Sequence, residues 1–143
     1  GERTGPIVDF FTGPKKNCLS RGEVIKTFLI DQLGEDEKEL FLKVGTRKAL
    51  SISKASIALR ASVKDRKING LRVSFGSVGP TVVKSSLLAT AFEGQTLRED
   101  LLQQADWIVS QEIAPIDDFR SSAAYRVKVV QNLFRKGMNE LAK

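Results

Sequence analysis

Residues 41–59 read FLKVGTRKALSISKASIAL, and this stretch decides the fold. It begins with an apolar run that contains Lys43 and continues into a small basic loop at residues 45–48. Because successive side chains of a strand point to opposite faces, its strictly alternating second half predicts a half-buried β-strand. One face carries the apolar positions Ala55, Ile57, Leu59, Ala61 and Val63. A cationic loop between two strands can bind an anionic or electron-rich ligand, although solvated basic loops are the commoner case.

The length and composition predict one domain of ordinary size. A chain of 143 residues, 41% of them apolar, buries roughly two-thirds of the surface that its unfolded form exposes. No segment approaches the ~18 apolar residues of a membrane helix, and the first residues do not resemble a signal peptide. Cys18 is the only cysteine, so no internal disulfide can form, which suits a reducing compartment. We therefore expect a cytoplasmic protein with no membrane partner.

The absence of histidine excludes several kinds of site. It removes Ser-His and Cys-His nucleophile pairs and the commonest metal ligand. With a single cysteine as well, this chain alone cannot build a zinc site or an iron–sulfur cluster. We expect no catalytic residue and no metal ligand in it. The net charge of +6 raises the possibility of a nucleic-acid partner, but the basic residues lie in short clusters between acidic ones, so we expect none.

Residues 24–33 (VIKTFLIDQL) are predicted to form a strand. Apolar side chains alternate onto both of its faces, as in a strand that is covered on both sides. A small domain does not easily cover both faces of a strand. This pattern therefore predicts a neighbouring domain or a ligand over the face that carries Ile25.

The rest of the chain predicts an α+β fold. A second alternating strand at residues 68–76 follows a polar turn at 64–67, so the two strands form an antiparallel hairpin. A short helix is expected at about residues 84–92. A second helix is expected to begin at a capping box of Thr96 and Glu99 and to end at about residue 112. A third is expected to begin at Ser121 or Ser122 and to run to the carboxyl end. Gly137 costs ~1 kcal/mol inside this last helix, where fraying is expected. The expected architecture is an antiparallel sheet of three to four strands packed on about three helices.

No group of residues forms a self-sufficient active site. Asp117 and Asp118 are adjacent carboxylates, and Arg120 and Arg126 follow closely enough to pair with them. Carboxylates near a helix amino terminus are favoured by the helix dipole, so a structural ion-pair cluster is expected. The chain therefore looks like a module that completes a site held by another domain.

Four segments in order resemble the carboxyl-terminal domain of the FAD-binding (medium) subunit of the xanthine dehydrogenase, aldehyde oxidase and carbon monoxide dehydrogenase family of molybdenum hydroxylases. The last is the most specific, because its proline, aspartate, arginine and tyrosine-arginine stand where that family has them. The segments are residues 10–25 (FFTGPKKNCLSRGEVI), 41–58 (FLKVGTRKALSISKASIA), 71–80 (LRVSFGSVGP) and 113–126 (IAPIDDFRSSAAYR).

The resemblance implies an oxidoreductase complex in which this domain has no activity alone. In that family a molybdopterin subunit oxidises the substrate, an iron–sulfur subunit with [2Fe-2S] clusters relays electrons, and FAD passes them to NAD or another acceptor. The glycine-rich amino-terminal FAD-binding domain has no counterpart among residues 1–143, which are expected to be a single carboxyl-terminal domain. By the resemblance, Ile25 and Lys43 are flavin contacts, and residues 44–54 form the loop on the acceptor side of the flavin. Lys43 there would stabilise the reduced flavin, and Arg47 and Lys48 would favour an anionic dinucleotide.

Two other readings of these residues stay open. Lys43 can simply extend from a strand edge into solvent. The whole domain can also be a structural assembly domain that joins FAD, iron–sulfur and molybdenum subunits without flavin chemistry. Tyr125 and Trp107 are then interface or core anchors.

Overall fold

The computed structural model describes residues 1–47 and 50–143, so Lys48 of the predicted basic loop lies outside the described residues. The chain divides into two compact units, Gly1–Gln32 and Leu33–Lys143. The assignment of all 143 residues to one domain therefore stays a prediction.

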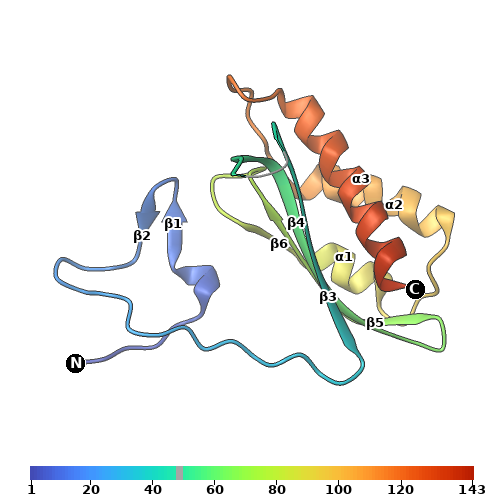
Figure 1. Ribbon diagram of the computed structural model, residues 1–143, viewed down its shortest axis with the longest axis horizontal. Coiled ribbons are helices and arrows are strands. Elements are labelled where there is room, and N and C mark those ends of the chain that lie inside the picture. The colour runs from blue at the N-terminus through green and yellow to red at the C-terminus, as the bar shows by residue number, and fades with distance from the viewer. Residues whose placement is uncertain (48–49) are drawn as a thin grey trace. The chain divides into compact units, whose positions relative to one another are not determined.

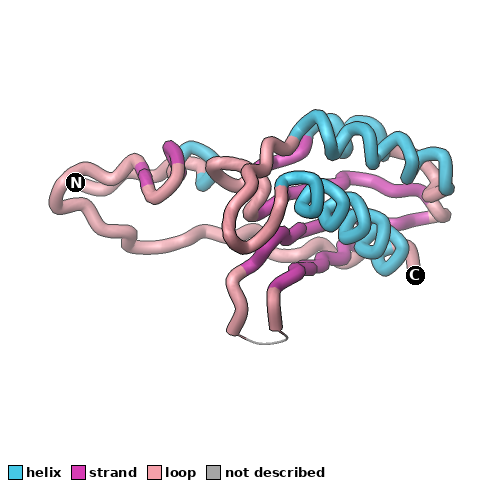
Figure 2. The backbone as a smooth tube through the Cα atoms, turned by 90° about the horizontal axis from the view of Figure 1, so that it is seen from above, coloured by secondary structure: helices cyan, strands magenta, loops and turns pink. Residues whose placement is uncertain are grey.

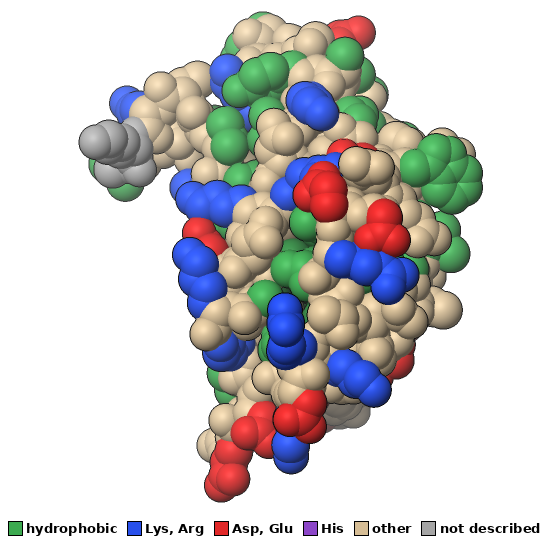
Figure 3. All heavy atoms as spheres, turned by 90° about the vertical axis from the view of Figure 1, so that its right-hand side faces the viewer, with side chains coloured by type: hydrophobic (Ala, Val, Ile, Leu, Met, Phe, Trp, Pro, Cys, Tyr) green, Lys and Arg blue, Asp and Glu red, His purple; other side chains and the backbone are tan. Residues whose placement is uncertain are grey.

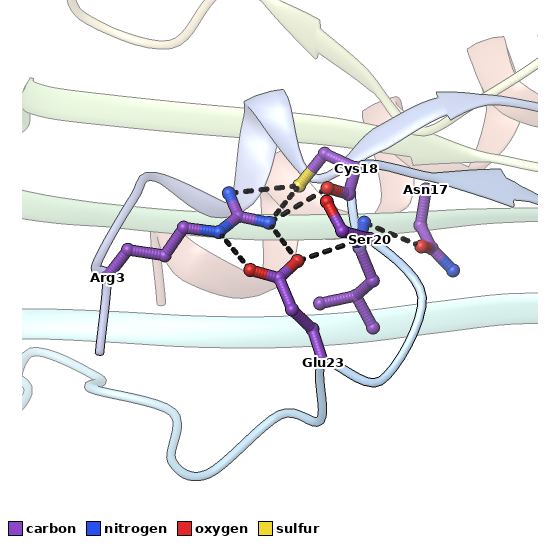
Figure 4. Close-up of polar contacts among 6 residues, drawn as sticks. Arg3, Asn17, Cys18, Ser20 and Glu23 are labelled. Atoms are coloured by element: carbon purple, nitrogen blue, oxygen red, sulfur yellow. Dashed lines mark hydrogen bonds and ion pairs between the residues drawn. The ribbon is translucent and has the colours of Figure 1, made fainter. Parts of the chain in front are cut away.

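The first unit is a small hairpin with an ion pair beside it. A 3-10 turn, η1 (Ile7–Asp9), precedes strand β1 (Phe11–Gly13), which pairs with β2 (Lys16–Asn17). Arg3 donates two hydrogen bonds to the carboxylate of Glu23 at 2.8 and 2.9 Å and one to the Cys18 carbonyl at 2.8 Å (Figure 4). Because Arg3 and the Ser20 N–H donate to it, the pKa of Glu23 falls to about 2.

The prediction of a strand at residues 24–33 is wrong. These residues have no regular secondary structure, and most of their apolar side chains are exposed, with Val24, Leu29 and Ile30 each above 80%. Apolar residues on both faces indicate a buried strand only if another strand supplies hydrogen bonds and other layers cover the faces. The described residues of the first unit supply neither to this segment.

The second unit is built on an antiparallel sheet with the strand order β3-β4-β5-β6 (Figure 1). The strands are β3 (Glu37–Gly45), β4 (Ser53–Lys64), β5 (Lys67–Gly76) and β6 (Val83–Ser85). The apolar positions Ala55, Ile57, Leu59 and Ala61 are at most 2% exposed, so the predicted alternation is confirmed. β6 was not predicted, because its three residues lie at the edge of the segment assigned to a helix.

Three helices pack on the same face of this sheet, which confirms the predicted α+β fold. They are α1 (Ser86–Phe92), α2 (Glu99–Glu112) and α3 (Ala123–Leu141). Figure 2 shows them running alongside the strands. Phe92 of α1 meets Phe134 of α3 edge to face at 5.2 Å, and both rings are fully buried. Among the described residues, no helix is long and apolar enough to cross a bilayer.

Two local predictions about the helices are wrong and one is confirmed. The capping residue of α2 is Arg98 rather than Thr96, and Thr96 instead forms a bridge with Lys67. α3 runs through Gly137 without fraying there, because the glycine is buried against β4. Ser122 caps α3 as predicted, since its hydroxyl accepts a hydrogen bond from the Tyr125 N–H at 3.3 Å.

Candidate functional site

Lys43 lies on the face of the sheet that is turned away from the helices, which we call the open face. In the strand register, Lys43 pairs with Ser56, and Ser56 pairs with Gly76. One step along the same face, Phe41 pairs with Ala58 and Ala58 with Ser74. The centre of the open face is therefore a floor of small residues, which lets another layer approach the backbone closely. Phe41, which is 65% exposed, stands at its edge.

A hollow of about 370 Å³ lies next to this floor. The side chains of Phe41, Ala58, Arg60, Arg72 and Ser74 take part in its lining. Arg60 also forms a salt bridge with Glu37 at the amino end of β3. This bond, together with the Gly34 N–H, lowers the pKa of the Glu37 carboxyl to about 2.

The Lys43 ammonium is exposed and partly engaged by the loop that follows β3. Its Nζ donates to the Ser51 carbonyl at 3.3 Å, which leaves other donor positions of the ammonium for a ligand. The loop folds back tightly here, because a Cβ on Gly45 would lie 2.0 Å from the Ser51 Oγ. A larger residue at this position would force the Ser51 side chain to move.

Two hydroxyls at the start of β4 and just before it are buried without a partner within the part of the chain that the structure describes. They are Ser51 Oγ and Ser53 Oγ. Buried polar groups normally have a hydrogen-bond partner, so these two hydroxyls are exceptions among the described residues.

Arg47 is bound to its own loop. Its Nε and Nη2 donate to the Leu50 carbonyl at 3.2 and 2.7 Å. Leu50 itself is 91% exposed and has a positive φ of 49°. Arg47 thus shapes the loop and also adds positive charge beside Lys43.

The ion-pair cluster predicted at the start of α3 is confirmed for Arg126 and Asp118, but the further contacts of Arg126 were missed. Arg126 Nη2 donates to Asp118 Oδ1 at 2.8 Å, and Nη1 donates to the carbonyls of Lys54 at 2.6 Å and Ser77 at 2.8 Å. Arg120 contributes only its backbone N–H to Asp118. Burial raises the pKa of Asp118, but hydrogen bonds from the Arg120 N–H, the Arg126 guanidinium and the Ser121 N–H bring it below its usual range. In the sequence, the signal for these buried contacts was a lone arginine, Arg126, among the apolar residues of the last helix.

Ile25 and Lys43 belong to different units, so their expected proximity stays a prediction. Ile25 is 45% exposed. Charged side chains of both signs are interspersed on the face of the molecule in Figure 3, rather than gathered into one basic patch.

The residues around Lys43 fit one edge of a flavin. The exposed Lys43 ammonium is a donor that suits the carbonyl oxygens of such a ring. Within the described residues we find no glycine-rich loop opening a helix that would hold the phosphates. The chain can therefore supply part of an FAD site.

Residues 41–141 match the family model described as CO dehydrogenase flavoprotein C-terminal domain. The chain is 30% identical over 142 residues to the glyceraldehyde dehydrogenase medium chain of Sulfolobus acidocaldarius, covering 99% of this chain and 50% of the relative. It is 27% identical over 141 residues to the xanthine dehydrogenase FAD-binding subunit of Escherichia coli O157:H7, covering 98% and 48%. It thus spans about half the length of these relatives.

Solved structures share the fold at lower identity. CO dehydrogenase from Oligotropha carboxidovorans matches with a TM-score of 0.86 at 19% identity, over 94% of this chain and 46% of that one. Quinoline 2-oxidoreductase from Pseudomonas putida 86 matches with a TM-score of 0.78 at 17% identity, over the same shares. With a family model that covers most of its length, the chain belongs to the CO dehydrogenase flavoprotein C-terminal domain family.

Proposed function

We propose that this chain completes the FAD site of a molybdenum hydroxylase, in which FAD passes electrons from iron–sulfur clusters to NAD or another acceptor. The observation that carries the proposal is Lys43, an exposed ammonium on the open face of a domain from a flavoprotein family. FAD, when bound, supplies the electron-transfer chemistry, and the protein tunes it through nearby charge and hydrogen bonds.

Lys43 has two roles in this proposal. Its ammonium, which is exposed and only partly engaged by the Ser51 carbonyl, donates hydrogen bonds to the carbonyl edge of the flavin ring. Its positive charge favours the form of the cofactor that carries more negative charge, so it raises the flavin reduction potential. Arg47 adds charge that favours an anionic dinucleotide acceptor.

The flavin-holding partner approaches the open face in this account. Lys43 stands on that face, so a ring in contact with its ammonium lies over or beside the small residues Ser56 and Gly76. The exposed apolar residues of segment 24–33 also need cover, and the same partner supplies it, with Ile25 against the flavin. The iron–sulfur and molybdopterin subunits are the further partners that we propose, in the cytoplasm.

A structural assembly domain is the second candidate. It is favoured by large apolar side chains that stand exposed on the second unit, such as Trp107 at 64% and Phe119 at 92%. Tyr125 is 45% exposed and is a further candidate anchor. In this case the domain joins subunits and leaves the flavin unaffected.

One titration separates the two candidates. The chain is mixed with the amino-terminal FAD-binding domain of its enzyme, and FAD is titrated while flavin fluorescence is recorded. Tighter FAD binding or an altered fluorescence yield supports completion of the site. Association of the two domains without any effect on the flavin supports the assembly domain and contradicts our proposal.

A further inference from the structure

Arg126 connects three segments that lie far apart in the sequence. It sits in the first turn of α3, and its side chain is 5% exposed. Its terminal nitrogens reach the Lys54 carbonyl at the start of β4, the Ser77 carbonyl in the turn after β5, and Asp118 in the loop before α3.

The planar guanidinium suits this task because its donors point in fixed directions within one plane. Nη1 donates to the carbonyls of Lys54 and Ser77, and Nη2 donates to the carboxylate of Asp118. Asp118 supplies the negative charge that a buried guanidinium requires. Asp118 is itself fixed by the N–H groups of Arg120 and Ser121, at 2.9 and 3.0 Å. A lysine in place of Arg126 keeps the charge but has a single nitrogen to offer.

Tyr125, which precedes Arg126 in α3, contacts the side chain of Lys54. Lys54 Nζ lies 5.4 Å from the centroid of the Tyr125 ring, within the range of a cation–π contact. Tyr125 and Arg126 therefore fix both the side chain and the backbone of Lys54.

Lys54 lies close to Lys43 in the strand pairing, so its position affects the position of Lys43. Its neighbour Ser53 pairs with Gly45, and Ser56, two residues on, pairs with Lys43. The register between the two strands shifts between Val44 and Gly45, directly beside this point. The pairing of the two strands is thus irregular at this point, where Arg126 adds a hydrogen bond from outside the sheet.

We propose that Arg126 is a positioning residue that fixes the start of β4 and, through it, the place of the Lys43 ammonium. The functional part of this proposal rests on the role of Lys43 in the proposed function. The hold on β4 does not, so the two parts can be tested separately.

The hold is tested in the 143-residue chain by amide hydrogen exchange of the Arg126→Lys variant. We expect the amide exchange rates at residues 53–56 and at the turn 76–78 to rise together by about tenfold. Both segments lose a hydrogen bond from the same guanidinium, so both open more often. The centre of β5 keeps its protection. Arg135→Lys is the matched control, since Arg135 lies on the same helix but binds Asp106 and Glu99. Unchanged exchange at both segments overturns the proposal.

The consequence is tested in the assembled FAD-containing enzyme by the flavin reduction potential. Arg126→Lys is expected to shift the potential in the same direction as Lys43→Met and by less, while Arg135→Lys leaves it unchanged. A shift with Lys43→Met but none with Arg126→Lys overturns the positioning role. If Lys43→Met itself changes nothing, the proposed function fails, and hydrogen exchange alone then decides whether Arg126 holds β4.

Discussion

Gly137 of α3 lies directly against Leu59 of β4. A Cβ on Gly137 would come within 2.2 Å of Leu59 Cδ1, and Leu59 is only 2% exposed. The helix and the sheet therefore lie too close at this glycine for a larger residue to fit without movement, and Gly137→Ala is expected to destabilise the protein. Overpacking costs about 1–3 kcal/mol and the better helix propensity of alanine returns about 1 kcal/mol, so we expect a net loss of about 1 kcal/mol by chemical denaturation.

Asn132→Ala is the control for this prediction. Asn132 is exposed on the same helix, where alanine is the better helix former, so its free energy of unfolding should not fall. If Gly137→Ala is as stable as Asn132→Ala, the close approach of α3 to β4 is not a constraint on the fold.

The two predicted helix caps should respond differently to mutation. Ser122 accepts the Tyr125 N–H, so Ser122→Ala is expected to cost about 1 kcal/mol in the free energy of unfolding. Thr96 does not cap α2, so Thr96→Ala should stay within about 0.5 kcal/mol of the parent. Equal losses of stability for the two variants in thermal or urea unfolding would show that Thr96 caps α2 after all.

The salt bridge between Arg60 and Glu37 predicts a specific acid sensitivity. The pKa of Glu37 is lowered from 4.5 to about 2, so its contribution to stability is fully present above pH 4.5 and is lost as the pH falls towards 2. Glu37→Gln should flatten the fall of the unfolding free energy across this window. The measurement is urea unfolding at a series of pH values, and an unchanged slope would show that Glu37 is not paired in solution.

The open face should not tolerate a bulky charge if the flavin-holding domain docks there. Ala58 lies at the centre of its small-residue floor, opposite Phe41 and Ser74. Ala58→Arg is expected to weaken association with that domain by about tenfold or more, because an unpaired buried guanidinium costs several kcal/mol. Asn132→Arg adds the same charge on the exposed side of α3 and serves as the control. Equal affinities by calorimetry would place the interface elsewhere.

Alternation and turn chemistry were sufficient to predict the hairpin of β4 and β5. The period-2 pattern from Ala55 to Ala61 depends only on which face of a strand is buried, and the structure buries these residues as expected. The turn at Asp65 and Arg66 has positive φ at both positions, as in a tight hairpin. Local signals of this kind are complete within a few residues.

Signals that depend on distant partners were misread or missed. Residues 24–33 carry the pattern of a buried strand, but the described residues give them no strand to pair with. Gly137 was assigned a local cost because its partner, Leu59, is 78 positions away in the sequence. Arg126 was assigned to a nearby carboxylate, which is confirmed, but its bonds to Lys54 and Ser77 follow only from the fold. For the candidate site, the sequence predicted Lys43 and the loop, whereas the unmet hydroxyls of Ser51 and Ser53 needed the structure.

The role of Lys43 is tested most directly by the flavin reduction potential of the assembled enzyme carrying Lys43→Met. Methionine keeps most of the length of the side chain and removes the charge. Lys38→Met is the matched control, because Lys38 lies on the same strand but donates to the Leu141 carbonyl on α3. We predict that Lys43→Met lowers the potential and slows reduction of the acceptor, while Lys38→Met changes neither. An unchanged potential and an unchanged rate with Lys43→Met would contradict the account.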